Sequence, residues 1–489
     1  MGLRARLIYF SVPLFLLSFH VFLFDSTVMA EALNKNKEGA SRKTATETVM
    51  NDVLEGFDDD PVKGFLDGFD DDTSDLEEKK IVSSEKSRIS LSGHLELGSS
   101  YNYAHRSPDV GETDWRGLSK LRLELLVKFK IDLSDNWKGI VSGSGFFDSI
   151  YQLREDANYS DPVLEDYEKE VEFRELFLQG SLSQNTDLKL GRQIVVWGKS
   201  DNIRITDVLN PLNNREPGIT NLESLRLPVF MTRLDYYFGK VSISGIAIHE
   251  ILFNKDPVSG SDFYPYETTL PEENIPDTDF ENTEWAMAVN CIFDKWDISF
   301  YLARIFDDQA HIELAGSEMY LEHARLTMVG LSSGYAMGNW MFKSEAAYFD
   351  GMRFFNVPDT GFSRMDFMFG FEYSGFKETF IGIEAVNRHY NNWNPAVEQS
   401  PDYAIENDFQ IVLHISKEFL NNTLALSFIG SAWGVDAGNG SFQRYTAKYD
   451  ISDSLNLLVG LIDYQSGDKI EMKNIGNNDR IYVSIRYSF

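Results

Sequence analysis

Apolar and polar residues alternate at every second position in many stretches between Arg88 and Phe489. In the clearest stretch, 121–133, seven apolar residues share one phase, only Leu126 lies out of phase, and charged residues fill most of the other positions. Successive side chains of a β-strand point to opposite faces, so this pattern predicts a strand that separates two different solvents. The same pattern returns at 89–97, 296–302, 365–373, 409–415 and 481–489.

The segments between the predicted strands alternate in length. Eight short polar turns, such as 134–136, alternate with nine longer polar segments, such as 199–227 and 254–283. This asymmetry is typical of outer-membrane barrels, whose strands must close into a ring because every backbone N–H and C=O in hydrocarbon needs a partner. We therefore predict an all-β fold over residues 88–489, a transmembrane antiparallel up-and-down β-barrel of about 18 strands, with 16 as the alternative. A soluble all-β exported protein would explain the alternation but not the loop lengths.

The first thirty residues have the order of a secretory signal. Arg4 and Arg6 precede an apolar run at 7–24, and small residues end at Ala30. This order predicts a signal peptide over residues 1–30, and a retained transmembrane anchor is the alternative. No later stretch approaches the ~18 apolar residues that a spanning helix needs, so a membrane location would require strands.

Residues 31–87 form an acidic segment. Between residues 52 and 78 there are twelve carboxylates and one basic residue, Lys63, and the word GFDDD begins at both Gly56 and Gly68. High charge with few apolar residues predicts a disordered periplasmic segment, which could dock a periplasmic partner. A calcium site is the alternative, although the ligand spacing and the closing Glu of a calcium loop are missing. The net charge of −31 argues against a nucleic-acid partner.

The last predicted strand ends in an aromatic residue. The alternating stretch 481–489, with Tyr487 and Phe489, resembles the closing strand of Gram-negative outer-membrane proteins, which the barrel-assembly machinery recognises. The resemblance implies that Tyr487 and Phe489 belong to an assembly signal and that this machinery and outer-membrane lipid are partners. We expect the strand to close the barrel against the first one, with Phe489 at the lipid interface.

A second resemblance lies in the stretch LKLGRQIVVWGKSDNIRITDVLNPLN. Its Gly-Arg-Gln at 191–193, Trp-Gly at 197–198 and Asn-Pro at 210–211, with Leu-Arg-Leu-Pro at 225–228, resemble the strand and loop of an uncharacterised family of porin-like outer-membrane proteins. The resemblance implies a barrel with a passage in the outer membrane of a Gram-negative bacterium. It implies no particular substrate.

This stretch leaves two questions open. Arg192 shares the apolar phase of Leu188 and Leu190, so it either lies near the membrane rim and extends to head groups or follows a bulge that resets the phase. The long loop after Trp197 either folds into the mouth of the barrel and narrows it or stays at the surface.

Residues for catalysis do not converge in the sequence. The eight His are scattered, Cys291 is the single cysteine, and no H-E-x-x-H word occurs. Hydrolases and metal enzymes need convergent nucleophiles, bases or ligands. The sequence therefore predicts no enzyme, no catalytic residue, no metal site in the barrel and no cofactor.

Passage of small solutes through a polar lumen is the predicted function. A barrel of about 18 strands is too wide for wall side chains to fill. With the apolar phase toward lipid, ten charged residues are expected to line the lumen: Arg122, Glu124, Lys128, Lys130, Arg325, Lys343, Glu345, Asp366, Glu372 and Arg486. Because salt screens the acidic loops, we expect weak selectivity at high salt and cation preference at low salt. The alternatives are an export or adhesion component docked through its acidic segment, or a barrel enzyme.

Overall fold

The computed structural model describes residues 88–220 and 222–489. The predicted signal peptide, 1–30, and the predicted acidic segment, 31–87, lie outside the described residues. Within the described ranges, no helix is both long and apolar enough to cross a membrane.

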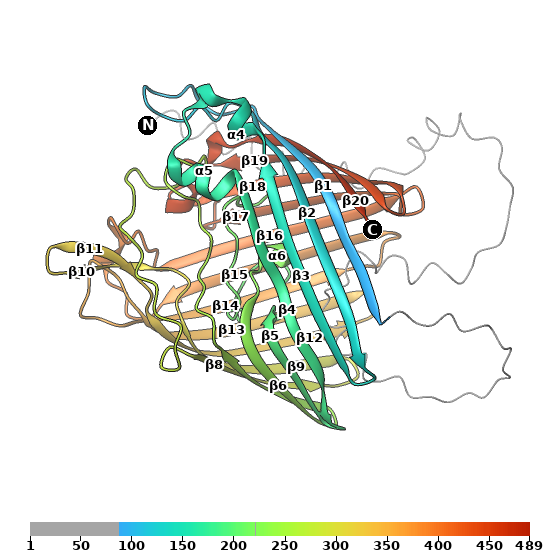
Figure 1. Ribbon diagram of the computed structural model, residues 1–489. Coiled ribbons are helices and arrows are strands. Elements are labelled where there is room, and N and C mark those ends of the chain that lie inside the picture. Colours follow the sequence, from blue (N-terminus) through green and yellow to red (C-terminus); the bar gives the residue numbers. More distant parts are fainter. Residues whose placement is uncertain (1–87, 221) are drawn as a thin grey trace, which may run out of the picture. The chain divides into compact units, whose positions relative to one another are not determined.

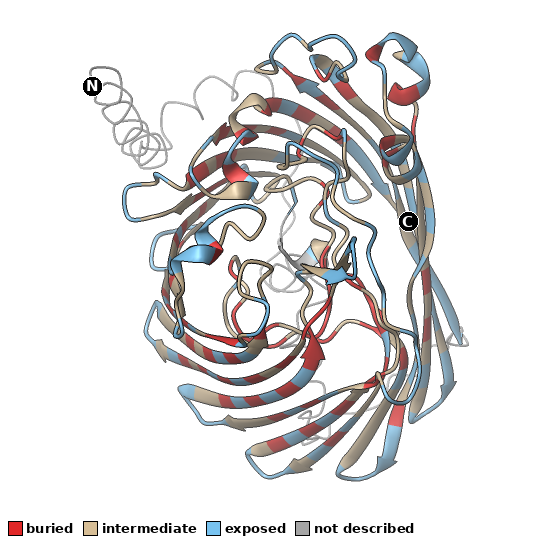
Figure 2. Ribbon diagram, turned by 90° about the vertical axis from the view of Figure 1, so that its left-hand side faces the viewer, coloured by how far each residue is buried: buried red, intermediate tan, exposed pale blue. Residues whose placement is uncertain are grey.

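Eighteen strands form one closed antiparallel ring (Figures 1 and 2). The first nine are β1 (Ile89–Asn102), β2 (Gly117–Ser134), β3 (Trp137–Asp148), β4 (Lys169–Ser183), β5 (Thr186–Gln193), β6 (Val229–Phe238), β7 (Val241–Ile248), β8 (Glu284–Ile292) and β9 (Trp296–Phe306). The other nine are β12 (Arg325–Met337), β13 (Trp340–Met352), β14 (Phe362–Tyr373), β15 (Thr379–Tyr390), β16 (Asn407–Phe419), β17 (Leu424–Trp433), β18 (Gly440–Ser452), β19 (Leu455–Gln465) and β20 (Arg480–Ser488).

Each strand pairs with its neighbours in sequence, and the pairing of β1 with β20 closes the ring. Between β9 and β12, the strands β10 (His311–Ala315) and β11 (Glu318–Glu322) form a separate hairpin. The predicted barrel of about 18 strands is confirmed, and the 16-stranded alternative is wrong.

The two ends of the ring differ as the sequence predicts. Turns at one end are as short as the two residues between β2 and β3, whereas residues 194–228 and 249–283 form long connections at the other end. The long connections carry the hairpin and the short helices α4 (Ile150–Leu153), α5 (Asp161–Tyr167) and α6 (Leu222–Leu225). Figure 1 shows α4, α5 and the hairpin gathered at this end.

The outer face of the ring is apolar. In β14, Phe367 and Phe369 are 60% and 50% exposed, whereas Asp366 and Met368, which alternate with them, are 1% and 0% exposed. The exposed side chains therefore point outward, and an outward apolar band is what the hydrocarbon of a membrane requires.

The seam between β1 and β20 depends on a glycine. Gly93 and Phe489 exchange two backbone hydrogen bonds, each of 3.0 Å. A Cβ atom at Gly93 would lie 2.2 Å from the carbonyl oxygen of Leu126 and 2.9 Å from the ring of Phe489, so no larger residue fits. The rings of Tyr487 and Phe489 are about half exposed on the outer face. Their role as an assembly signal stays a prediction.

Replacing Phe369 with Arg should destabilise the barrel by ~2–4 kcal/mol, because a basic side chain near the centre of the lipid face loses its hydration. The free energy of unfolding in lipid vesicles, measured by urea titration, checks this. Phe280→Arg is the matched control, since Phe280 is 83% exposed in the loop 249–283. Equal losses in both variants would show that Phe369 does not face lipid.

Deleting Phe489 should reduce the yield of folded, heat-modifiable barrel, because the seam loses two hydrogen bonds and a ring that covers Gly93. Gel mobility with and without heating measures that yield. Deleting Val110, whose side chain is fully exposed in the first long loop, is the control. Normal yield without Phe489 would contradict the closing role of this residue.

Candidate functional site

The connection between β5 and β6, residues 194–228, packs against inward side chains of the barrel, and we call it the lumen loop. Figure 2, which looks into the ring, shows chain segments inside it. The ring of Trp197 stacks on that of Tyr301 from β9, with centroids 4.8 Å apart. Four further loop side chains join an apolar cluster with buried residues of the surrounding strands: Val195, Ile203, Ile205 and Leu209. Of the two predicted positions for this loop, the one inside the barrel is found.

Glu345 of β13 holds the first part of the lumen loop. It accepts hydrogen bonds from the backbone N–H groups of Lys199 at 2.5 Å, Ser200 at 2.7 Å and Thr206 at 3.2 Å. The hydroxyl of Thr206 donates to it at 2.8 Å. Gly198 permits the approach, since a Cβ atom there would lie 2.6 Å from the carboxylate of Glu345. Hydrogen bonds to a charged acceptor are the stronger kind, so Glu345 fixes this turn firmly.

Glu384, on β15, lies two strands along the wall from β13 and holds the next residues of the lumen loop in the same way. It accepts hydrogen bonds from the N–H groups of Asp201 at 2.8 Å and Asn202 at 3.1 Å, and from the hydroxyl of Ser200 at 2.9 Å. Glu345 and Glu384 are only 3% and 4% exposed. We call them the anchor carboxylates, because together they satisfy five backbone N–H groups that have no strand partner.

Ion pairs surround the anchored turn. Lys199 lies 2.6 Å from Asp297 of β9, and Lys343 of β13 donates to Asp201 at 2.7 Å. Lys343 also contacts Glu372 of β14. The side chain of Asp201 remains half exposed, so the edge of the loop presents charge to water.

The last part of the lumen loop binds another part of the wall. Lys120 of β2 donates to Glu216, and the guanidinium of Arg122 lies 3.7 Å from the same carboxylate. Burial would raise the pKa of Glu216, but the charges of Lys120 and Arg122 outweigh it and lower the pKa to about 2. Glu216 is therefore ionised at any physiological pH.

Two side chains of β18 and β19 complete this attachment. Arg444 donates to the carbonyl oxygens of Gly218 at 2.9 Å and Ile219 at 2.7 Å, and the hydroxyl of Tyr464 donates to that of Pro217 at 2.6 Å. The lumen loop leaves the wall at β5 and β6, meets β9, β13 and β15, and then meets β18, β19 and β2. It thus crosses the interior of the barrel.

Residues of the four sequence words in the stretch 188–228 form hydrogen bonds at the base of the lumen loop. The side-chain oxygen of Asn210 accepts from the N–H of Val195 at 2.8 Å, and its amide donates to the carbonyls of Gln193 at 3.2 Å and Leu227 at 2.8 Å. Arg226 donates to Asp207 at 2.8 Å. The Gly-Arg-Gln, Trp-Gly, Asn-Pro and Leu-Arg-Leu-Pro words therefore meet in space around the two ends of one loop.

A second long connection, residues 249–283, reaches β20 and β4. Arg480 of β20 donates to Asp262 at 2.8 Å, with side chains only 3% and 8% exposed. Lys255 contacts Glu170 and lies 2.9 Å from Glu172, both on β4. This connection narrows the barrel further on its long-loop side.

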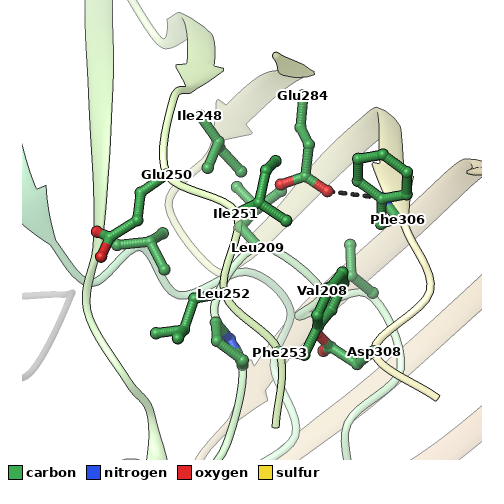
Figure 3. A pocket seen from close by; sticks show the side chains of 12 residues that line it. Val208, Leu209, Ile248, Glu250, Ile251, Leu252, Phe253, Glu284, Phe306 and Asp308 are labelled. Carbon is green, nitrogen blue, oxygen red and sulfur yellow. Dashed lines mark hydrogen bonds between the residues drawn. The ribbon is translucent and has the colours of Figure 1, made fainter. Parts of the chain in front are cut away.

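Three carboxylates and mainly apolar side chains line a pocket beside the lumen loop (Figure 3). Glu284 accepts a hydrogen bond from the N–H of Phe306 at 2.6 Å, and Asp308 lies 3.7 Å from Arg204 of the lumen loop. Burial raises the pKa of Asp308 to about 7, although Arg204 opposes the shift. The third carboxylate is Glu250. The pocket thus contains a group that changes charge near neutral pH.

Nine of the ten predicted lumen residues have the inward phase of their strands: Arg122, Glu124, Lys128, Lys130, Lys343, Glu345, Asp366, Glu372 and Arg486. They differ in access to water. Asp366 is 1% exposed and accepts two hydrogen bonds from Arg364, at 2.7 and 2.9 Å. Arg486, about half exposed, pairs with Glu96 at 2.6 Å. Contact of these residues with a solute stays a prediction.

The predicted inward position of Arg325 is wrong. Arg325 begins β12 and shares its phase with Val329 and Leu331, which are exposed on the outer face. Arg192 also has the outer phase, near the long-loop end of β5, and pairs with Glu250 at 2.9 Å. The rim position predicted for Arg192 is therefore found, and no bulge resets its phase.

The word GLSSG at 330–334 has the spacing of a nucleophile motif, and the structure gives it no such geometry. It lies within β12 rather than on a strand-to-helix turn. Ser332 is fully buried, and its hydroxyl bonds to that of Tyr301 at 3.0 Å. Among the described residues, no group of three or more His, Cys, Asp or Glu is placed to hold a metal ion.

Comparison with known proteins gives a family and a fold. A family model described as "Protein of unknown function (DUF1302)" matches residues 102–370. No curated protein matches the chain. Two crystal structures from Acinetobacter baumannii are similar at 11% identity over 82% of this chain: OccAB2, with 98% of that chain covered and a TM-score of 0.51, and OccAB1, with 97% covered and a TM-score of 0.50. The similarity shows a shared fold, the large closed β-barrel.

The stability of the barrel should fall between about pH 4 and pH 8, partly through Asp308. An acid with a higher pKa in the folded than in the unfolded protein stabilises the fold below its unfolded pKa, and this contribution is lost as pH rises through the folded value, about 7. Asp308→Asn should therefore flatten the dependence of the unfolding temperature on pH. Asp453→Asn, on the exposed turn before β19, is the control. An unchanged slope for Asp308→Asn would contradict the raised pKa.

Proposed function

This chain belongs to the DUF1302 family, whose function is unknown, and we propose that it is a constricted outer-membrane channel for small polar solutes. The observation that carries the proposal is the lumen loop, which crosses the barrel and is bonded to wall strands near both of its ends. A loop that only covered the surface would need no such bonds. A loop held across a wide barrel limits the size of the solutes that can pass.

Water-exposed charge inside the ring supports a channel rather than a solid plug. Lys448 and Asp450 have the inward phase of β18 and are 48% and 42% exposed. Arg233 of β6 and Lys128 of β2 are about one-third exposed. Side chains that face inward and still meet water mark an aqueous space, and its mixed charge suits small polar solutes of either sign. We expect cations to be favoured as salt is lowered.

No observation on residues 88–220 and 222–489 favours docking or catalysis over passage. The acidic segment that would dock a partner lies outside the described residues. The one word with nucleophile spacing is buried in a strand.

Single-channel conductance in planar bilayers tests the proposal. Wild-type protein should conduct, and Glu345→Gln, Glu384→Gln and the double variant should conduct more, with larger fluctuations. A neutral amide has one acceptor oxygen where the carboxylate has two, and each N–H group left unsatisfied costs ~1–3 kcal/mol, so the loop should detach.

Glu124→Gln is the matched control, because Glu124 has the inward phase of β2 but forms no hydrogen bond or ion pair with the lumen loop among the described residues. It should change ion preference more than conductance at high salt. Silence of the wild type and of all three loop variants would overturn the channel. Conduction with equal values in all variants would retain the channel and remove the loop as its constriction.

A further inference from the structure

Two arginines lie side by side on the outer face of the ring. Arg304 is two residues before the end of β9, and Arg325 begins β12. Arg304 is exposed and is the Cα partner of both Thr327 on β12 and Trp285 on β8. Trp285 is itself 50% exposed. The two cations therefore share the face that meets lipid.

Neither arginine has an ionic partner in the described part of the chain. Arg304 donates to the hydroxyl of Thr327 at 2.8 Å and to the carbonyl of Arg325 at 3.4 Å. Arg325 donates to the carbonyl of Glu281 at 3.3 Å, and its guanidinium lies 3.8 Å above the ring of Phe306. All these acceptors are neutral. The carboxylates of Glu284 and Asp279 attract the charge of Arg325, but neither forms an ion pair with it in the described part of the chain.

This arrangement is unusual for the chain. Arg192, another outward arginine of the described strands, is paired with Glu250 at 2.9 Å. Asp350, on β13, also faces outward as the Cα partner of Thr327 on β12, yet it forms no ion pair with either arginine. Two adjacent positive charges that form no ion pair within the described part of the chain attract an anion from outside the protein.

The position of the pair selects the kind of anion. Along β9, Phe300 and Leu302 are each 50% exposed and precede Arg304, so the pair lies where the apolar band ends on the long-loop side. The long loops of such barrels lie on the outer side of the membrane, and the membrane surface there is formed by lipid head groups. Guanidinium groups bind phosphate through paired N–H donors, and Trp285 suits the same interface.

We propose that Arg304 and Arg325 form a binding site for the phosphate of an anionic glycolipid, such as lipid A, in the outer leaflet. The site lies on the lipid face and is independent of passage through the lumen. It would attach one lipid to β8, β9 and β12, beside the strand residues that contact the lumen loop.

Binding of bisphosphorylated lipid A to the purified full-length protein in neutral detergent tests the site. Dephosphorylated lipid A with the same acyl chains separates phosphate recognition from acyl-chain association. A parallel measurement with inorganic phosphate shows whether the site binds a lipid phosphate or a free phosphate ion. Wild-type protein should prefer the bisphosphorylated lipid. Arg304→Gln and Arg325→Gln should each weaken that binding about fivefold, as expected for one basic residue at an anionic surface.

Arg304→Lys should retain part of the binding, and Arg353→Gln, which removes an exposed arginine from a loop at the same end, should retain all of it. Conductance should not change in any of these variants, so this test is separate from that of the channel. If Arg325→Gln does not fold, Arg304→Gln decides, because its side chain is exposed. Equal affinity for both lipids, or unchanged affinity in Arg304→Gln, would overturn the site.

Discussion

In hydrocarbon, every backbone N–H and C=O of a strand must be paired within the protein, and the rest of this structure depends on that constraint. It closes the ring at β1 and β20, where Gly93 and Phe489 exchange hydrogen bonds. The hydrocarbon also separates the two faces of the ring, because side chains that cannot leave water must point inward. A closed ring of eighteen strands then encloses more space than wall side chains fill, and the lumen loop occupies part of that space.

The lumen loop meets the same hydrogen-bonding requirement by a different route. It has no neighbouring strand beside Lys199 to Asn202, so the wall supplies acceptors from side chains instead. A buried carboxylate is itself costly unless donors surround it. Glu345 and Glu384 satisfy both needs at once, since each receives at least two loop N–H groups. Loop and wall therefore stabilise each other, and neither part of the contact is favourable alone.

The barrel could be predicted from the sequence because its rules are local. Alternation identifies each strand, and the length of each connection identifies the end of the ring at which it lies. The outward position of Arg325 could not be predicted in this way, because a strand's first residue can belong to either phase and only the pairing with β9 settles it.

The apolar cluster inside the barrel could not be predicted. Inward Met231, Met328 and Met368 are apolar on the face expected to be polar, and they pack in one cluster with a loop that is distant in sequence from Met328 and Met368. Glu345 was predicted to face inward, but nothing near Glu384 indicates a partner more than 180 residues away.

The distance in sequence between the lumen loop and its partners bears on how the chain assembles. Arg444 and Tyr464 are 226 and 247 residues from the loop carbonyls that they bind. Contacts of such high order form late, because the chain must first lose the entropy of closing a very long segment. The lumen loop therefore finds its final place only when the last strands arrive, and completion of the ring and completion of its interior become one cooperative event.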